Sequence, residues 1–334
     1  MYKNYADKKV FFLDLDGTVY LSDTLISGAK EAIEALRQNA KVFFLTNNSS
    51  KSRDTYAKKL TNLGIPTSRE DIITSSGATA HYLKLNGIKE VSVLGTDGLK
   101  DELKENGINV VKSAKTAVLG FDTDLSYANL CAFCDLIRGG SRYIATHPDF
   151  NCPTKNGFIP DVGSFMALIN ASTGKKPEVI CGKPNAIMAK YALSRAQALP
   201  SEAVMVGDRI YTDLKFGADN GISAALVLTG EGTREELASS GVTADVFNSL
   251  YDIVFYGVGE KFKQKLGAGL SGIKNIFAKR SKNSVHVPQD SLPSGDSSTL
   301  PNASCRTDYE AMNEAKKVDD SPIFTSKTED LTNE

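Results

Sequence analysis

Short apolar runs alternate with segments of helical periodicity along most of this chain. Val10–Leu13 and Val42–Leu45 are two such runs, each of a length typical of a strand buried on both faces. Helical spacing follows both runs, with Ser27 and Ser52 as the predicted N-caps. Further expected strands are Val91–Leu94, Ala117–Leu119, Tyr143–Ala145, Val179–Ile180, Ala203–Val206 and Ala224–Leu228. Strands alternating with helices favour a parallel sheet covered on both sides, so the predicted fold class is α/β and Rossmann-like.

Polar residues follow several of these runs directly. The segments are Asp14–Thr18, Thr46–Asn48, Gly182–Pro184 and Gly207–Asp213. Because the carboxyl ends of parallel strands meet at one edge of a sheet, we expect all of these segments to converge there. Each segment alone is equally well explained as a turn, a surface loop or a helix cap. Together they assemble carboxylates, a hydroxyl and an ammonium group, which favours a functional site.

These residue types suit phosphoryl transfer. The carboxylate of Asp14 can attack phosphorus, and Asp16 can protonate the leaving oxygen and later deprotonate water. Clustered Asp14, Asp16 and Asp208 would repel one another without a cation, and oxygen ligands of this kind suit Mg²⁺. Thr46 and Lys183 would balance the charge on the phosphoryl oxygens.

The polar segments read DLDGTVY, TNNSS, GKP and GDRIYTD. They resemble the motifs of haloacid dehalogenase (HAD) superfamily phosphatases of class IIA, the NagD-like and p-nitrophenylphosphatase-like members. The similarity extends from about Val10 to Leu228. It implies a Mg²⁺-dependent phosphatase that hydrolyses a small phosphorylated metabolite, such as a sugar phosphate, through an aspartyl-phosphate intermediate.

The resemblance also implies a role for each matching residue. Asp14 would be the nucleophile and Asp16 the general acid and base. Thr46 and Asn47 would bind the phosphate. Lys183 would steady both the nucleophile and the phosphate.

The metal is expected on Asp14, the backbone carbonyl of Asp16 and Asp208, with Asp213 supporting these ligands. His147 stands where family members usually have Asn, in the segment Thr146-His147-Pro148-Asp149. Two interpretations of His147 stay open: a substrate contact from the cap, or a structural histidine in a turn.

A large cap inserted between the second and third motifs explains the length of the chain. The predicted division is a HAD catalytic core at 1–82 and 178–254, an inserted α/β cap domain at 83–177, a basic amphipathic segment at 255–280 and a disordered tail at 281–334. The tail is rich in Ser, Thr, Asn, Asp and Pro and has too few apolar residues to form a core. A cap over the site would exclude water and select the leaving group.

The segment 255–280 has an apolar stripe at helical spacing, surrounded by Lys and Arg. One hypothesis is weak contact with an anionic membrane surface. The alternative is a loosely helical linker or a helix that packs on the core, which the glycines of this segment favour. Gly267–Gly272 also matches the letters of a dinucleotide fingerprint, but no strand precedes it.

Two other local patterns have structural explanations. Asp122 and Asp124 imitate the Asp-x-Asp pair but lack the following Gly-Thr turn, so they are expected to cap a helix that starts near Leu125. Cys131 and Cys134 lie in a helical pattern and are expected to be half-buried core residues rather than zinc ligands.

The net charge and the cysteine content limit which partners and which cellular location are expected for this chain. The formal net charge of −1 gives no reason to expect nucleic acid. No apolar run reaches the length of a membrane span, no secretory leader is recognisable, and the 5 cysteines are few, so the cytoplasm is the expected location. A homodimer formed through the cap is a further expectation from the resemblance.

Two rival functions remain. A phosphotransferase or mutase would share the aspartyl-phosphate, but a base at Asp16 favours attack by water. A catalytically silent binding protein on the same fold is disfavoured, because all the proposed catalytic side chains are present.

Overall fold

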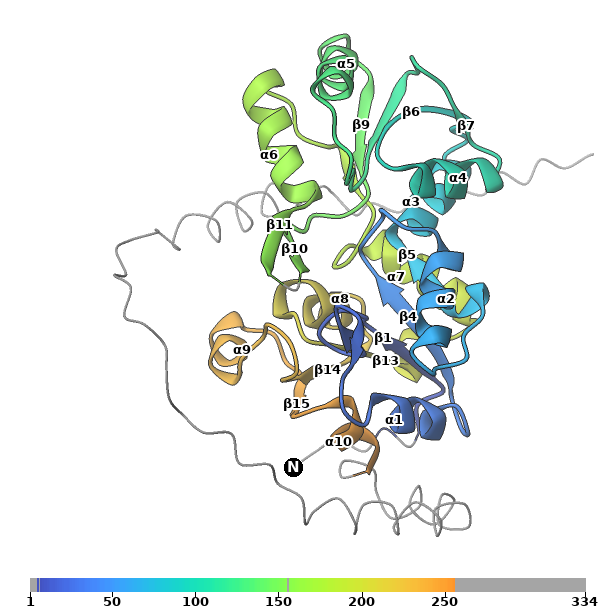
Figure 1. Cartoon of the computed structure of the whole chain (residues 1–334), viewed down its shortest axis with the longest axis vertical. Helices are drawn as coiled ribbons and strands as arrows, with labels where there is room; N and C mark the ends of the chain where they lie inside the picture. Colours follow the sequence, from blue (N-terminus) through green and yellow to red (C-terminus); the bar gives the residue numbers. More distant parts are fainter. Residues whose placement is uncertain (1–4, 6, 155, 256–334) are drawn as a thin grey trace, which may run out of the picture. The chain divides into compact units, whose positions relative to one another are not determined.

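The first of two parallel sheets is formed by both ends of the described chain. The computed structural model describes Tyr5, residues 7–154 and residues 156–255 (Figure 1). This 6-stranded sheet has the order β15-β14-β13-β1-β4-β5, and all of its neighbouring strands are parallel. Its strands are β1 (Val10–Leu13), β4 (Lys41–Thr46), β5 (Ile72–Thr74), β13 (Ala203–Gly207), β14 (Ser223–Val227) and β15 (Asp245–Phe247).

Strand β1 shows why both faces of this sheet are covered. Phe11 and Leu13 pack in one buried cluster, whereas Val10 and Phe12 pack in another. Because successive side chains of a strand point to opposite faces, an uninterrupted apolar run needs helices on both sides. Helices with residues in the first cluster are α1 (Ala29–Leu36), α2 (Arg53–Asn62) and α10 (Leu250–Phe255). Helices with residues in the second are α3 (Ser75–Leu85), α4 (Asp97–Glu105), α7 (Ala186–Ala196) and α8 (Lys215–Asp219).

The second sheet is formed by the middle of the chain. It is 5-stranded, with the order β12-β9-β8-β6-β7 and parallel neighbours throughout. Its strands are β6 (Glu90–Leu94), β7 (Asn109–Val110), β8 (Thr116–Leu119), β9 (Arg142–Ala145) and β12 (Val179–Ile180). Helix α4 contacts β7, and helix α5 (Tyr127–Arg138) contacts β6 and α6 (Val162–Thr173).

Two hairpins and a few short elements complete the described chain. The hairpins are β2 (Tyr20–Leu21) with β3 (Thr24–Leu25), and β10 (Asn151–Thr154) with β11 (Gly157–Pro160). The short elements are Arg69–Asp71, Pro200–Glu202, Ile210–Leu214 and α9 (Arg234–Ser240). The sequence patterns did not predict either hairpin.

The α/β fold class is confirmed, and so is every strand expected from the sequence, with ends that differ by no more than one residue. Ser52 caps α2 as expected, because its hydroxyl accepts a hydrogen bond from the amide of Thr55 at 3.3 Å. The cap predicted at Ser27 is wrong. The N-cap of α1 is Gly28, which has a φ of 81° and lacks a Cβ, an atom that would lie 2.7 Å from the ring of Tyr251.

The cap of α5 was also predicted wrongly. Ser126, not Asp122 or Asp124, accepts the hydrogen bond from the first turn of this helix. Asp122 instead accepts a hydrogen bond from the amide of Asp124 at 3.1 Å, which closes the preceding loop. Cys131 is half-buried and Cys134 is buried on α5, as expected.

The strand that precedes Gly182–Pro184 belongs to the second sheet, because β12 pairs with β9. The expectation that all four polar segments follow strands of one sheet is therefore wrong for this segment. The division into a core (1–82 and 178–254) and a cap (83–177) stays a prediction, with β12 lying in the second sheet at its boundary.

The basic segment 255–280, apart from Phe255, and the tail 281–334 lie outside the described residues. The predictions of an amphipathic helix, a membrane contact and a disordered tail therefore stay predictions. Among the residues that the structure describes, no helix is long and apolar enough to cross a membrane.

Candidate active site

The loop after β1 places Asp14 and Asp16 at the end of the first sheet. The amide of Asp14 still donates to Val206 O of β13 at 2.9 Å, so the backbone of Asp14 continues the ladder. The chain then turns tightly, and Leu15 O accepts hydrogen bonds from Val19 and Tyr20. Gly17 adopts a φ of 87° in this turn.

Lys183 reaches this loop and forms the centre of the site. Its ammonium donates to Asp14 Oδ1 at 2.5 Å, to Asp213 Oδ1 at 2.6 Å and to Leu45 O at 3.1 Å. Burial lowers the pKa of Lys183, but the two carboxylates outweigh burial, so the pKa lies above its ordinary value. The ammonium therefore stays charged between Asp14 and Asp213.

Three buried carboxylates converge beside Lys183. One oxygen each of Asp14, Asp208 and Asp213 lies within 4.8 Å of the others. Asp208 Oδ2 accepts the amide of Glu231 at 2.8 Å, whereas Asp208 Oδ1 is buried without a hydrogen-bond partner. Burial and the charge of Asp213 raise the pKa of Asp208 to about 7, and burial with the charge of Asp213 raises that of Asp14 well above its ordinary value. An unpartnered carboxylate oxygen in such a cluster fits a divalent cation.

Asp16 stands apart from this cluster. It is half-buried and lines the same pocket as Asp14. Burial raises the pKa of Asp16, against the opposing effect of Lys59 and Arg209. A raised pKa suits a carboxyl group that must donate a proton.

Thr46 and Asn47 are buried at the end of β4 and line the pocket. The hydroxyl of Thr46 accepts the amide of Asn48 at 3.2 Å. Three hydrogen bonds hold the side chain of Asn47: its Oδ1 accepts the amide of Lys183 at 2.8 Å, and its Nδ2 donates to Lys183 O at 3.0 Å and to Asp149 Oδ2 at 2.8 Å. A phosphate contact by this amide group would break these bonds.

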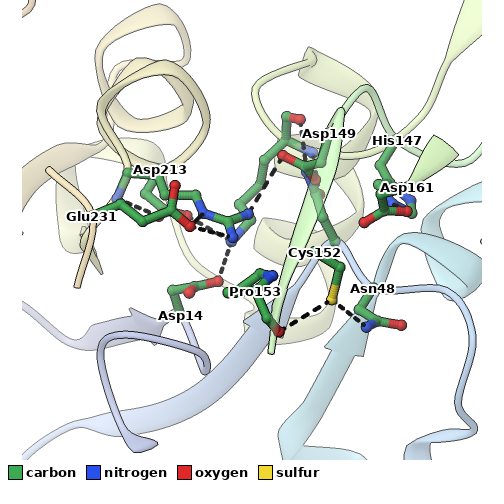
Figure 2. A network of polar contacts seen from close by, with 12 residues as sticks. Asp14, Asn48, His147, Asp149, Cys152, Pro153, Asp161, Asp213 and Glu231 are labelled. Atoms are coloured by element: carbon green, nitrogen blue, oxygen red, sulfur yellow. Dashed lines mark hydrogen bonds and ion pairs between the residues drawn. The ribbon is translucent and has the colours of Figure 1, made fainter. Parts of the chain in front are cut away.

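The other wall of the pocket comes from residues after β9. Asp149, Cys152, Pro153 and Asp161 lie on that wall (Figure 2). Burial raises the pKa of the Cys152 thiol to about 12, so this thiol stays protonated. Sequence reasoning missed this wall because the hairpin β10–β11 has no alternating apolar pattern. The polar segment Thr146–Asp149 was the feature of the sequence that could have indicated this wall.

Arg209 is a further pocket residue that the sequence analysis missed. Its guanidinium donates to Glu231 Oε1 at 2.8 and 3.0 Å and forms an ion pair with Asp149 Oδ1 at 3.7 Å. The sequence could have indicated Arg209, because this residue directly follows the motif residues Gly207 and Asp208.

The structure does not place His147 on the pocket wall. Its side chain is fully buried, and its Nε2 lies 2.9 Å from Asp161 Oδ1. Its Nδ1 lies 3.0 Å from the hydroxyl of Thr146. Both ring nitrogens are thus engaged, which favours the structural interpretation over a direct substrate contact.

Replacing His147 by Ala is expected to lower the free energy of unfolding by about 2–3 kcal/mol, because Asp161 loses a buried partner. The ratio of activities on a sugar phosphate and an aryl phosphate should not change. Thermal unfolding and initial rates measure the two effects, with the half-buried His81→Ala as the control. A changed substrate ranking with unchanged stability would instead support substrate contact.

Comparison with known proteins places the chain in a family. The haloacid dehalogenase-like hydrolase family matches residues 11–109, and the HAD-hydrolase-like family matches residues 180–253. The sugar-phosphatase AraL of Bacillus subtilis is 38% identical over 229 residues, which cover 67% of this chain and 84% of AraL. The 5'-nucleotidase YutF of the same organism is 35% identical over 232 residues, or 69% of this chain and 90% of YutF.

Solved structures agree with this placement. The 4-nitrophenylphosphatase of Thermotoga maritima superposes with a TM-score of 0.72 at 42% identity, covering 75% of this chain and 97% of that one. A glycerol phosphate phosphatase of Mycobacterium tuberculosis, solved in complex with magnesium, has a TM-score of 0.69 at 28% identity, covering 75% and 78%. The chain therefore belongs to the haloacid dehalogenase-like hydrolases. Within them it is a phosphatase of the NagD-like class IIA.

Proposed function

We propose that this protein hydrolyses phosphomonoesters of small metabolites, sugar phosphates among them, through a phosphorylated Asp14. The observation that carries the proposal is the position of Lys183, whose ammonium bonds Asp14 and Asp213 beside the unpartnered oxygen of Asp208. This arrangement supports a nucleophilic carboxylate and a fixed cation on the pocket wall, with the unpartnered oxygen of Asp208 close by.

These positions support a reaction in two steps. A carboxylate oxygen of Asp14 attacks phosphorus, the bond from phosphorus to the leaving oxygen breaks, and Asp16 gives that oxygen its proton. Water then attacks the phosphorus of the phosphorylated Asp14 and passes a proton back to Asp16. Inorganic phosphate leaves and both carboxyl groups return to their first state. Lys183 holds Asp14 in place throughout and stabilises negative charge on the phosphoryl oxygens.

We further propose that Mg²⁺ is the cofactor. Asp14, Asp208 and the backbone carbonyl of Asp16 would hold it, with Asp213 supporting, and the free Asp208 Oδ1 fits this role. When bound, the ion supplies positive charge that neutralises the phosphoryl group.

Chelation is expected to abolish phosphate release from p-nitrophenyl phosphate, and added Mg²⁺ should restore it. Ca²⁺ should restore it poorly, because its larger radius and higher coordination number would misplace Asp14. Colorimetric rates after dialysis against a chelator measure this, with calorimetric titration of each ion as a readout independent of turnover. Full activity in the presence of the chelator would contradict the proposed role of the carboxylates.

A phosphotransferase remains the rival for the finer function. The half-buried Asp16, with a pKa raised by burial, supports hydrolysis because it can deprotonate water at the second step. Phosphate release should therefore equal alcohol release from the same substrate, whereas transfer to an added sugar would lower the phosphate yield.

The similar proteins and the lining of the pocket both narrow the class of substrate. The acidic group of Asp161 on the pocket wall supports a leaving group rich in hydroxyl donors, such as a sugar. We keep the cytoplasm as the proposed location, since few cysteines are present in the sequence. A screen of phosphorylated metabolites tests the substrate class.

A further inference from the structure

Asp149 is a buried carboxylate with no role in the reaction as derived above. It is 2% exposed and lies in the loop between β9 and β10. Its Oδ2 accepts a hydrogen bond from Asn47 Nδ2 at 2.8 Å, and its Oδ1 forms the 3.7 Å ion pair with Arg209. Its own backbone is held by the amide of Gly163, which donates to Asp149 O at 2.8 Å. Burying a carboxylate is costly unless it is paired and hydrogen-bonded, so these partners hold Asp149 in place.

These contacts close a ring of five residues, which we call the polar ring; Figure 2 labels its members Asp149 and Asp213. It runs from Asp149 through Asn47 to the backbone amide of Lys183, and from the ammonium of Lys183 to Asp213. Asp213 Oδ2 accepts the amide of Arg209 at 3.1 Å, and the guanidinium of Arg209 returns to Asp149. Lys183 is therefore held at both ends, by its main chain and by its ammonium group.

The polar ring joins the two sheets. Asp149 follows β9 and Lys183 follows β12, and these strands are neighbours in the second sheet. Asn47 follows β4 of the first sheet, while Arg209 and Asp213 follow β13. The position of the ammonium beside Asp14 thus depends on contacts between residues of both sheets.

We propose that Asp149 is a positioning residue, which fixes Lys183 against Asp14 by holding Asn47 and Arg209. This proposal rests on the function proposed above. Without Asp149, the amide group of Asn47 loses an acceptor and the guanidinium loses its partner in the second sheet. The long side chain of Lys183 is then less firmly held, so its ammonium can move away from Asp14. Displacement of a catalytic group by about 1 Å can lower a rate about 100-fold.

The test compares Asp149→Ala and Asp149→Asn with the unchanged full chain. For Asp149→Ala we expect kcat to fall about 100-fold, with KM for p-nitrophenyl phosphate nearly unchanged. The same factor should apply to a sugar phosphate, because Lys183 acts on the phosphoryl group that both substrates share. The Asp149→Asn variant keeps one acceptor oxygen, so its kcat should lie between those of Asp149→Ala and the unchanged protein. Asp122→Asn, which also removes a buried carboxylate, is the matched control and should keep full activity.

Two further measurements separate positioning from other roles. Asn47→Ala combined with Asp149→Ala should cost no more than the larger single change, because both act on Lys183. Hydrogen exchange of the Lys183 amide should be faster in Asp149→Ala, and this readout needs no activity. Faster exchange in a protein that releases no phosphate from any substrate would keep the positioning role and overturn the proposed function.

Other outcomes overturn the positioning role itself. A loss that is large for a sugar phosphate and small for the aryl phosphate would make Asp149 a substrate contact. Unchanged exchange at Lys183 would contradict the proposal whatever the activity. A lower unfolding temperature that accounts for the whole loss, with kcat per folded molecule unchanged, would make Asp149 merely structural.

Discussion

Asp14→Asn is expected to lower phosphatase activity on the order of 1,000-fold or more, because the attacking oxygen is lost. Asn has nearly the same size, so the loop after β1 and its hydrogen bond from Asp14 to Val206 O should persist. The change also removes one member of the carboxylate cluster that we propose as the metal site. Phosphate release under saturating Mg²⁺ measures the loss, with circular dichroism as the check on folding.

The exposed Asp135→Asn is the matched control, since its side chain is 75% exposed and lies on α5. It should leave the rate unchanged. Activity of Asp14→Asn above about a tenth of the unchanged protein corresponds to less than about 1.4 kcal/mol of barrier. Such a small effect would exclude Asp14 as the nucleophile.

Gly17→Ala is also expected to have a large effect, because two costs add at this position. The φ of 87° is unfavourable for any residue with a Cβ, which costs about 1–2 kcal/mol. A Cβ would also lie 2.6 Å from Cγ of Asp208, so the carboxylate would have to move. We expect activity to fall about 100-fold and the unfolding temperature to drop. Initial rates and thermal unfolding measure the two effects.

Gly140→Ala separates these two costs. Gly140 has a φ of 89°, close to that of Gly17, but no atom lies within 4 Å of its Cβ position. It should therefore lose a similar amount of backbone stability and retain full activity. Equal activity in both variants would show that contact with Asp208 does not matter for the reaction.

Four strands of the first sheet, β1, β4, β13 and β14, were predictable because their signal is local, whereas the short edge strands β5 and β15 were not predicted. A run such as Val10–Leu13 is apolar at every position, and only a strand covered on both faces buries all of it. The polar segments were predictable for the same reason, since they follow the runs directly. Asp14, Lys183, Asp208 and Asp213 do meet, as expected.

What could not be predicted depends on distant residues. The N-cap of α1 is decided by Tyr251, which lies more than 200 positions away in sequence and leaves room only for Gly28. Sheet membership of β12 depends on its pairing with β9, and nothing in Val179–Ile180 itself indicates which sheet it joins. His147 could not be assigned because its partner Asp161 follows a hairpin that has no apolar alternation.

The central claim is that Asp14 carries the phosphoryl group, and trapping it is the most direct measurement. Asp16→Asn should slow attack by water, while the good leaving group of p-nitrophenyl phosphate still allows Asp14 to react without a general acid. We predict that acid quenching of this variant with substrate and Mg²⁺ yields a peptide whose mass has increased by one phosphoryl group, located on Asp14. Phosphate on another residue, or continued turnover by Asp14→Asn, would contradict the account.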